Sequence, residues 1–304
     1  MSAKPIVAAT DGSEESLRAV EWAAREAVLR GAPLRIVSAA ALLPRMVEHQ
    51  EGTELATVTD ALSQDRDLAL AAGAERAAKL SPGLLIDTDR LTGPPAQAVT
   101  ESGSGALMLV VGSRGVGAFT AMVLGSVSRY AATHASCPVV VVRDETAASH
   151  RQVVIGVGDL DDCADSLTFA FEEAALRQAS LMAVHSWHAP QSDISRAGQA
   201  FTAPGAHGVE AEAGRRLAAL LEDWRPKYPD VPVSQDVAHG HPGRTLVGLS
   251  ARADLVVIGR HARHSGLPGP GTVTHAVLNH AHGPVVTVPS AGAVPGGVIR
   301  DASP

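Results

Sequence analysis

Short apolar runs alternate with amphipathic segments along the whole chain. In the first half, five runs rich in Val, Ile and Leu predict β-strands near residues 5–10, 33–39, 84–90, 107–112 and 138–142. Segments with helical spacing of apolar residues separate these runs. Strands that alternate with helices indicate an α/β domain, in which helices cover both faces of a parallel sheet. In such sheets, ligands bind beyond the carboxyl ends of the strands.

The first predicted helix has clear start and stop signals. Ser13 is a good N-cap, and Glu14 and Glu15 follow it in the first turn, where the helix dipole favours negative charge. Gly31 and Pro33 end the helix before the next strand. The stripe predicted to face the core consists of Leu17, Val20, Ala24, Ala27 and Val28.

The second half of the chain repeats the first. Ile6–Asp11 reappears as Val153–Gly158 and Leu109–Gly112 as Val256–Gly259, both at an offset of 147 residues, whereas Cys137–Val140 reappears as Gly283–Val286 at 146. A register kept over a hundred residues and broken once indicates duplication. The second set of strands is predicted near residues 152–157, 181–186, 232–237, 254–259 and 284–288, with Leu167, Ala170, Phe171 and Ala174 facing inward.

The repeat divides the 304 residues into domains at 1–146 and 147–290 and a flexible tail at 291–304. A polar stretch at 143–151 is the expected linker, and residues 41–56 and 188–207 are expected to be mobile excursions. Hydrophobic residues make up 45% of the chain but aromatic residues only 3%, so Ala, Val and Leu must build the cores.

Charge and hydropathy exclude several classes of protein. The net charge is −7 and Lys and Arg form no cluster, so we expect no nucleic-acid partner. No apolar run approaches the roughly 20 residues of a membrane helix, and the N-terminus shows no secretory signal. The two cysteines, Cys137 and Cys163, have no paired or metal-ligand spacing. We expect a soluble cytoplasmic protein.

A glycine-rich loop follows the fourth strand. Gly112-Ser113-Arg114-Gly115 begins it, and Gly125-Ser126-Val127-Ser128 opens the next helix, with Ser126 at the expected N-cap. Free amides at a helix N-terminus bind anions, glycines let backbone approach a ligand, and serine hydroxyls can donate to phosphate oxygens. Ordinary turn glycines are the alternative. The loop is not a Walker loop, because no Gly-Lys-Ser/Thr follows.

The spacing resembles a known motif. Gly112, two residues, Gly115, nine residues, Gly125 and Ser126 are similar to the ATP motif of the universal stress protein family. Thr10-Asp11-Gly12-Ser13 resembles the start of that family's domains, and His134-Ala135-Ser136-Cys137-Pro138 resembles the approach to their closing strand. The resemblance covers nearly the whole chain, once per copy, as in tandem universal stress proteins of the actinobacterial type.

The resemblance implies a five-stranded flavodoxin-like or Rossmann-like domain that binds ATP, with Mg²⁺ possible beside the phosphates. Ala9, Thr10 and Asp11 would then approach the adenosine end, and Ala39 would contact adenine. The residues that would surround the ribose and phosphates are Gly112, Arg114, Gly115, Gly125, Ser126, Val127 and Ser128. Asp11 has a competing role as a capping residue at the helix start. The family also implies pairing of domains through their fifth strands, and a second chain could dock in the same way to give a homodimer.

The second copy departs from this motif. Gly158 stands in place of Asp11 and Ala262 in place of Gly115. The loop Arg263–Pro270 is one residue shorter and contains two prolines, which remove amides, although Gly271 and Thr272 keep the final glycine and hydroxyl. We therefore expect ATP in the first domain only.

These features favour a nucleotide-binding regulatory protein that acts in stress and has no catalytic residues. An ATPase or nucleotide-dependent transferase that uses the same loop is the alternative enzyme reading, and a nucleotide-free assembly module is a third. Histidines gather in the second half, as at His239 and His241, but carboxylate or thiol ligands at fixed spacing do not accompany them, so we expect no metal site.

Overall fold

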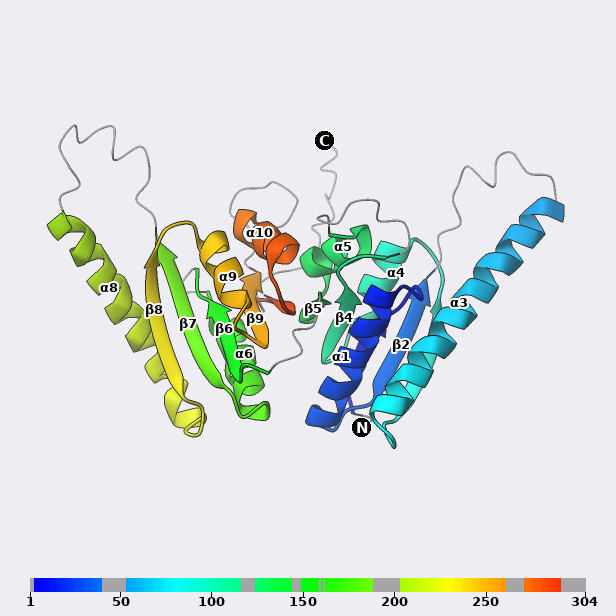
Figure 1. Ribbon diagram of the computed structural model, residues 1–304, viewed down its shortest axis with the longest axis horizontal. Coiled ribbons are helices and arrows are strands. Elements are labelled where there is room, and N and C mark those ends of the chain that lie inside the picture. Colours follow the sequence, from blue (N-terminus) through cyan, green and yellow to red (C-terminus); the bar gives the residue numbers. More distant parts are fainter. Residues whose placement is uncertain are drawn as a thin grey trace, which may run out of the picture. The chain divides into compact units, whose positions relative to one another are not determined.

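The computed structural model describes residues 3–39, 53–115, 124–143, 149–158, 160, 162–187, 203–260 and 271–290 (Figure 1). Side chains are described within these ranges except at 53–62, 187 and 203–207. The chain forms two compact units, of which the first contains the residues up to Val142 and the second begins at Arg143. The predicted tail and most of the two predicted excursions lie outside the described residues.

The first unit alternates strands and helices as the sequence predicts. Its elements are β1 (Ile6–Ala9), α1 (Glu14–Arg30), β2 (Leu34–Ala39), α3 (Thr53–Leu80), β3 (Ile86–Leu91), α4 (Pro95–Ser102), β4 (Met108–Gly112), α5 (Ser126–His134) and β5 (Val139–Val142). The strands pair in parallel in the order β3-β2-β1-β4-β5. This is the Rossmann order rather than the flavodoxin order, so successive strands are added on one side of β1 up to β3 and on the other side from β4 onward.

Apolar residues of the central strands and of α1 form the core of this unit. Every residue from Leu109 to Val111 and from Val139 to Val142 is buried, as expected for strands covered on both faces. In Figure 1, α1 and α3 cover one face of the sheet, and α4 and α5 lie behind it. Four members of the predicted α1 stripe are buried, but Val28 is 57% exposed. It lies in the last turn, just before Gly31 ends the helix in the left-handed conformation at φ 59°.

The second unit repeats this architecture. Its elements are β6 (Gln152–Gly156), α6 (Ala164–Leu176), β7 (Ser180–Trp187), α8 (Ala203–Glu222), a 3₁₀ turn (Arg225–Lys227), β8 (Val233–His239), α9 (Pro242–Ser250), β9 (Leu255–Arg260), α10 (Thr272–His280) and β10 (Val285–Pro289). Within this unit the order is β8-β7-β6-β9-β10. All four predicted inward residues of α6 are buried: Leu167, Ala170, Phe171 and Ala174.

The two sheets keep the same internal register. Ile6 pairs with Met108 in the first unit, and Val153 pairs with Leu255 in the second, so both partners move by 147 residues. The predicted linker is anchored at both ends to the second unit: Arg143 Nη1 donates to Leu278 O at 2.6 Å, and Asp254 accepts from the amides of His150 and Gln152.

Candidate functional site

A cavity of about 470 Å³ lies where the carboxyl ends of β1 and β4 meet. This is the point at which the strand order reverses, and open α/β sheets place their ligands there. The lining residues come from the ends of β1, β2 and β4 and from the starts of α1, α4 and α5. The fold therefore creates the cavity, and the loop sequences decide what lines it.

All eleven residues that the sequence analysis selected line this one cavity. They are Ala9, Thr10, Asp11, Ala39, Gly112, Arg114, Gly115, Gly125, Ser126, Val127 and Ser128. Five further lining residues were not selected: Ser16, Pro95, Val99, Val111 and Leu124. Pro95 and Val99 carry no sequence signal, because α4 reaches the site only through the crossover between β3 and β4. Ser16 could have been found from its place three residues after the Ser13 cap.

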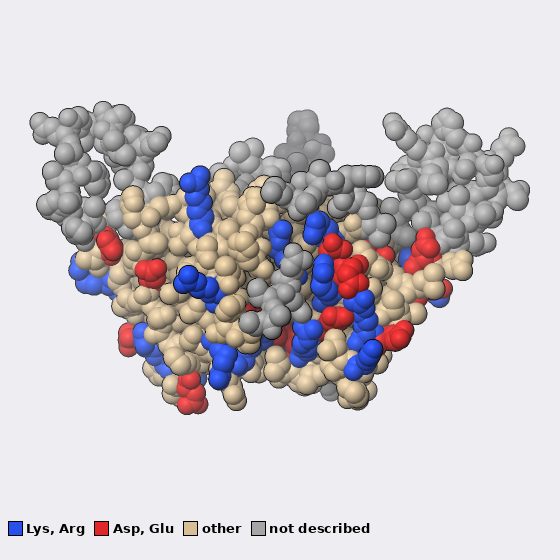
Figure 2. All heavy atoms as spheres, in the orientation of Figure 1, with Lys and Arg blue, Asp and Glu red and all other residues tan. Residues whose placement is uncertain are grey.

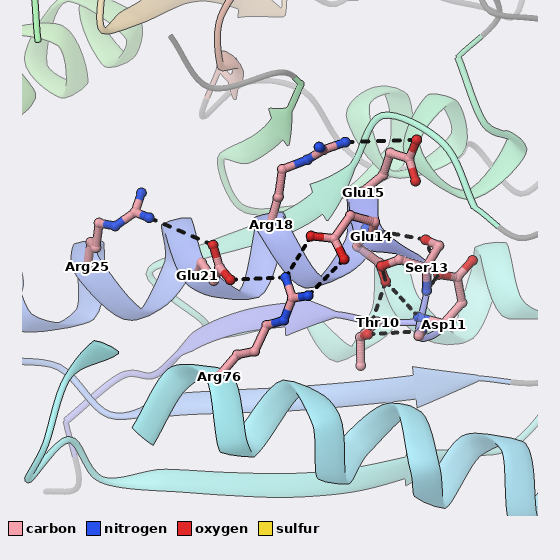
Figure 3. Close-up of polar contacts among 11 residues, drawn as sticks. Thr10, Asp11, Ser13, Glu14, Glu15, Arg18, Glu21, Arg25 and Arg76 are labelled. Carbon is pink, nitrogen blue, oxygen red and sulfur yellow. Dashed lines mark hydrogen bonds and ion pairs between the residues drawn. The ribbon is translucent and has the colours of Figure 1, made fainter. Parts of the chain in front are cut away.

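The turn between β1 and α1 is held by hydrogen bonds among its own residues (Figure 3). Ser13 caps the helix by accepting from Ser16 N at 3.3 Å. Asp11 Oδ1 accepts from Ser13 N at 3.1 Å and from Ser13 Oγ at 2.6 Å. Gly12 has φ 83°, a conformation that favours glycine. Asp11 thus supports the turn before the helix and also lines the cavity, whereas the helix cap itself is Ser13.

The three glycines of the motif have different reasons to be glycine. A Cβ on Gly112 would lie 2.9 Å from Glu15 O and 3.1 Å from Ser16 N, so this residue lets β4 pack against the backbone of α1. A Cβ on Gly115 would lie 2.3 Å from Asp11 Oδ2. At Gly125 the nearest atoms are 3.6 Å away, an ordinary contact, so the protein itself would accept a side chain there.

The start of α5 differs from the prediction in its cap. The N-cap is Gly125 (φ −59°, ψ 153°), and no side chain caps the helix, so Ser126 is the first helical residue. Gly125 N donates to Ser113 O, and Gly125 O accepts from Arg129 N. The amides of Ser126, Val127 and Ser128 precede the first intrahelical bond and lie at the cavity. Because Gly125 has no side chain to accept from these donors, no N-cap side chain stands between them and the cavity.

The hydroxyl of Ser128 has a hydrogen-bond partner within the protein. Ser128 Oγ is buried and donates to Gly112 O at 2.6 Å. Its single proton therefore connects α5 to the end of β4. Of the two serines expected to donate to phosphate, Ser126 keeps an exposed side chain at the helix start.

Charged side chains of α1 lie beside Arg114, which lines the cavity. Arg114 Nη2 lies 3.6 Å from Glu15 Oε1, and Arg18 Nη2 lies 3.9 Å from the same oxygen. Farther along, Arg76 of α3 donates to both carboxyl oxygens of Glu14 at 2.8 Å and to Glu21 at 3.1 Å (Figure 3). The hydrogen bond from Arg76 lowers the pKa of Glu14, and Glu14 raises the pKa of Arg76. Figure 2 shows basic and acidic side chains interspersed over this face of the first unit.

In the second unit, the end of β6 differs from the end of β1 in the first. A Cβ on Gly156 would lie 2.7 Å from Leu246 Cδ1, so the α9 side chain occupies the space that the Ala9 methyl group takes in the first unit. Helix α6 begins only at Ala164, and its N-cap, Cys163, makes no side-chain cap. Gly271 still caps α10 with φ −57° and ψ 156°. Ala262 and the loop Arg263–Pro270 lie outside the described residues.

The described residues bring no three His, Cys, Asp or Glu side chains together in a group that could hold a metal ion. The helices within those same ranges are too short or too polar to cross a membrane.

Comparison with known proteins gives a consistent result. The profile of the universal stress protein family matches residues 2–143 and again 149–289. A universal stress protein of Mycobacterium tuberculosis is 34% identical over 301 residues, which cover 92% of this chain and 95% of that protein. One of Mycolicibacterium smegmatis is 33% identical over 296 residues, 93% and 96% of the two chains. The crystal structure of a universal stress protein from Archaeoglobus fulgidus has the same fold, with a TM-score of 0.66 at 15% identity over 95% and 99% of the chains.

Proposed function

Because the chain belongs to the universal stress protein family and carries two of its domains in tandem, we propose that it is an ATP-binding regulatory protein of the stress response. The first domain holds one ATP, and hydrolysis is slow or absent. The observation that carries this proposal is the uncapped start of α5, where the amides of Ser126, Val127 and Ser128 line the same cavity as the β1–α1 turn. Three free amides and the positive end of a helix dipole suit a phosphate chain.

The rest of the cavity suits a nucleoside. Its volume of about 470 Å³ lies within the usual range of small-molecule sites. Ala9, Ala39, Pro95 and Val99 offer apolar surface to a base, and Asp11 and Arg114 add charge nearer the glycine loop. Mg²⁺ would enter with the phosphates, whose oxygens it prefers as ligands.

The charged groups at the site support binding rather than catalysis. Fast phosphoryl transfer uses a residue that positions the nucleophile and an arginine that stabilises the transition state. Asp11 accepts two hydrogen bonds from Ser13, and Arg114 lies beside Glu15, so each already has a structural partner. We therefore expect an ATP turnover far below that of a dedicated ATPase.

Titration of the full-length protein with ATP tests the proposal. One site per chain is the expected stoichiometry, and mass spectrometry of ligand released from purified protein should identify an adenine nucleotide. Two equivalent sites would contradict the restriction to the first domain. Rapid release of phosphate from labelled ATP would favour the enzyme alternative, and failure to bind any nucleotide would favour the assembly module.

We further propose that the two domains pair through their closing strands, and that a homodimer forms by the same logic. Each closing strand is the last in its own unit's order, and an uncovered edge invites pairing with another strand. Amide hydrogen exchange in the full-length protein should show strong protection at Val139 and Val285, whose amides point away from the neighbouring strand of their own unit. Rapid exchange at both residues would contradict the pairing of the two domains. Sedimentation analysis of the full-length protein tests whether it forms a dimer.

A further inference from the structure

Ser16 occupies a central place in the turn beside the cavity. It is the third residue of α1, is 4% exposed and lines the cavity. Its Oγ donates to Ser13 O at 2.9 Å and accepts from Asp11 N at 3.3 Å. Thr10 Oγ1, also buried, lies 3.1 Å from the same oxygen. One hydroxyl therefore contacts three of the residues that form the turn.

The direction of these hydrogen bonds can be worked out from the number of protons. A serine hydroxyl has one proton, and Ser16 uses it on the carbonyl of Ser13. Thr10 must then donate to Ser16, and Thr10 Oγ1 accepts in turn from Gly12 N at 3.2 Å. The amide of Asp11 also points at Ser16. The Thr10 hydroxyl and the amides of Asp11 and Gly12 thus belong to one chain of hydrogen bonds that ends at Ser13 O.

This arrangement gives the two ends of the cavity opposite hydrogen-bonding character. With the Thr10 hydroxyl and the Asp11 and Gly12 amides engaged, the turn offers oxygen acceptors to a ligand, foremost the Asp11 carboxylate. The start of α5 offers backbone donors. Acceptors suit the hydroxyl groups of a sugar, whereas donors suit phosphate.

We propose that Ser16 is a positioning residue for the nucleoside half of the bound nucleotide, and that its hydrogen bonds make the β1–α1 turn an acceptor for sugar hydroxyl groups. The proposal rests on the proposed function of the same site. Ser16 acts through Thr10 and Asp11, whose backbone and side chains it fixes at the end of β1. It has no role at the phosphate end, which α5 forms.

The duplicated domain supplies a matched control. Ser166 of α6 is 3% exposed, and its Oγ donates to Cys163 O at 2.9 Å, the same local bond that Ser16 makes to Ser13. At the offset of 147, however, Val157 stands in place of Thr10, so the hydroxyl chain has no equivalent there. Ser166→Ala removes the same bond from a helix start without touching the cavity.

The experiment measures three ligands on the full-length protein: ATP, adenosine and inorganic tripolyphosphate. In Ser16→Ala, the affinities for ATP and adenosine should fall by roughly tenfold, because a buried donor and an amide lose their acceptor. The affinity for tripolyphosphate should not change. Ser166→Ala should leave all three affinities unchanged. The wild type should also bind 2′,3′-dideoxyadenosine more weakly than adenosine, and Ser16→Ala should narrow that difference.

The outcomes separate the positioning role from a general loss of structure. An equal loss of adenosine and tripolyphosphate binding would show that Ser16 acts on the whole site, and an unchanged adenosine affinity would show that it positions nothing. If Ser16→Ala does not fold, Thr10→Val breaks the same chain with the residue that the second domain carries, and the same split is expected. A wild type that binds none of the three ligands overturns the proposed function, and this inference with it.

Discussion

The two domains build the same sheet but begin their first helices differently. In the first domain, Ser13 caps α1 four residues after β1 ends at Ala9. In the second, the cap at Cys163 comes seven residues after β6 ends at Gly156, and α6 lacks the turn that corresponds to Glu14–Ser16. The central strands keep their register, and α1 and α6 end at nearly equivalent residues, Arg30 and Leu176. The duplication therefore preserved what forms the core and changed the turns at the carboxyl edge.

The starts of α5 and α10, by contrast, are alike in the two domains. Gly125 and Gly271 have backbone angles within a few degrees of each other, and neither helix has a side-chain cap. A helix N-terminus of this kind is thus present in both domains. What distinguishes the first domain is the turn opposite it, where Asp11 and Ser16 line a cavity. The same helix start therefore persists in a domain whose β6–α6 turn differs from the β1–α1 turn.

The largest expected effect comes from a side chain at the start of α5. Gly125→Val should abolish ATP binding, a loss of at least about a hundredfold, because the methyl groups would occupy the space where phosphate meets the helix. The fold should persist, since a Cβ there makes only ordinary contacts of 3.6 Å. Calorimetric titration measures the loss. Gly271→Val is the matched control and should leave ATP affinity unchanged; equal losses would mean that both domains bind.

The second effect is on stability rather than on binding. Gly112→Ala should destabilise the first domain by about 2 kcal/mol, because its Cβ meets backbone atoms of Glu15 and Ser16 that cannot move independently of α1. Gly125→Ala, in the same motif, should change stability by less than about 0.5 kcal/mol. Urea denaturation of both variants without nucleotide compares them. Similar midpoints for the two would show that α1 yields to the extra methyl group.

A smaller effect tests how the second domain was rebuilt. The pair Gly156 and Leu246 carries the same number of side-chain carbons as Ala9 and Val99, which stand at the equivalent positions. Gly156→Ala and Leu246→Val should each destabilise the second domain by about 1 kcal/mol, through overpacking and a small cavity respectively. The double variant should cost less than the sum, because the two residues are in contact. Additive losses would show that the exchange is not compensated.

Sequence alone predicted the order of elements and eleven of the sixteen residues that line the cavity, for identifiable reasons. Apolar periodicity sets the strands, and start signals such as Ser13 and Gly31 delimit α1 within a residue. The eleven selected residues line one cavity because they lie at strand ends or on one glycine loop. Local spacing in the sequence is enough to identify both. The strand order β3-β2-β1-β4-β5 could not be read in this way, since it depends on how the crossovers pack.

Contacts between residues that are distant in the chain add what the sequence does not reveal. Ser126 has the right residue type for an N-cap, yet Gly125 occupies that position because its amide bonds to Ser113 O. Ser128 looked like a phosphate donor, but its proton goes to Gly112 O, sixteen residues earlier. Gly112 looked like a residue that admits ligand, whereas its missing Cβ faces α1. Each role is decided by tertiary packing, which a residue's type and spacing do not encode.

The smallest expected effect tests the ion pairs that hold α3 to the start of α1. Arg76 lowers the pKa of Glu14, so the Glu14 carboxyl binds a proton less readily in the folded domain than in the unfolded chain. Glu14 therefore contributes stability above its unfolded pKa of about 4.3, and this contribution is lost as the pH falls through the lower folded value. At pH 7, Arg76→Gln should speed hydrogen exchange slightly in the first turn of α1, and the difference from wild type should vanish under strongly acidic conditions.

The second domain carries Asp223 at the position equivalent to Arg76, so α6 should not respond. Arg215→Gln removes an exposed pair within α8 and serves as the control for loss of surface charge. A difference in α1 that persists unchanged in acid would mean that Arg76 acts by packing rather than by its charge on Glu14.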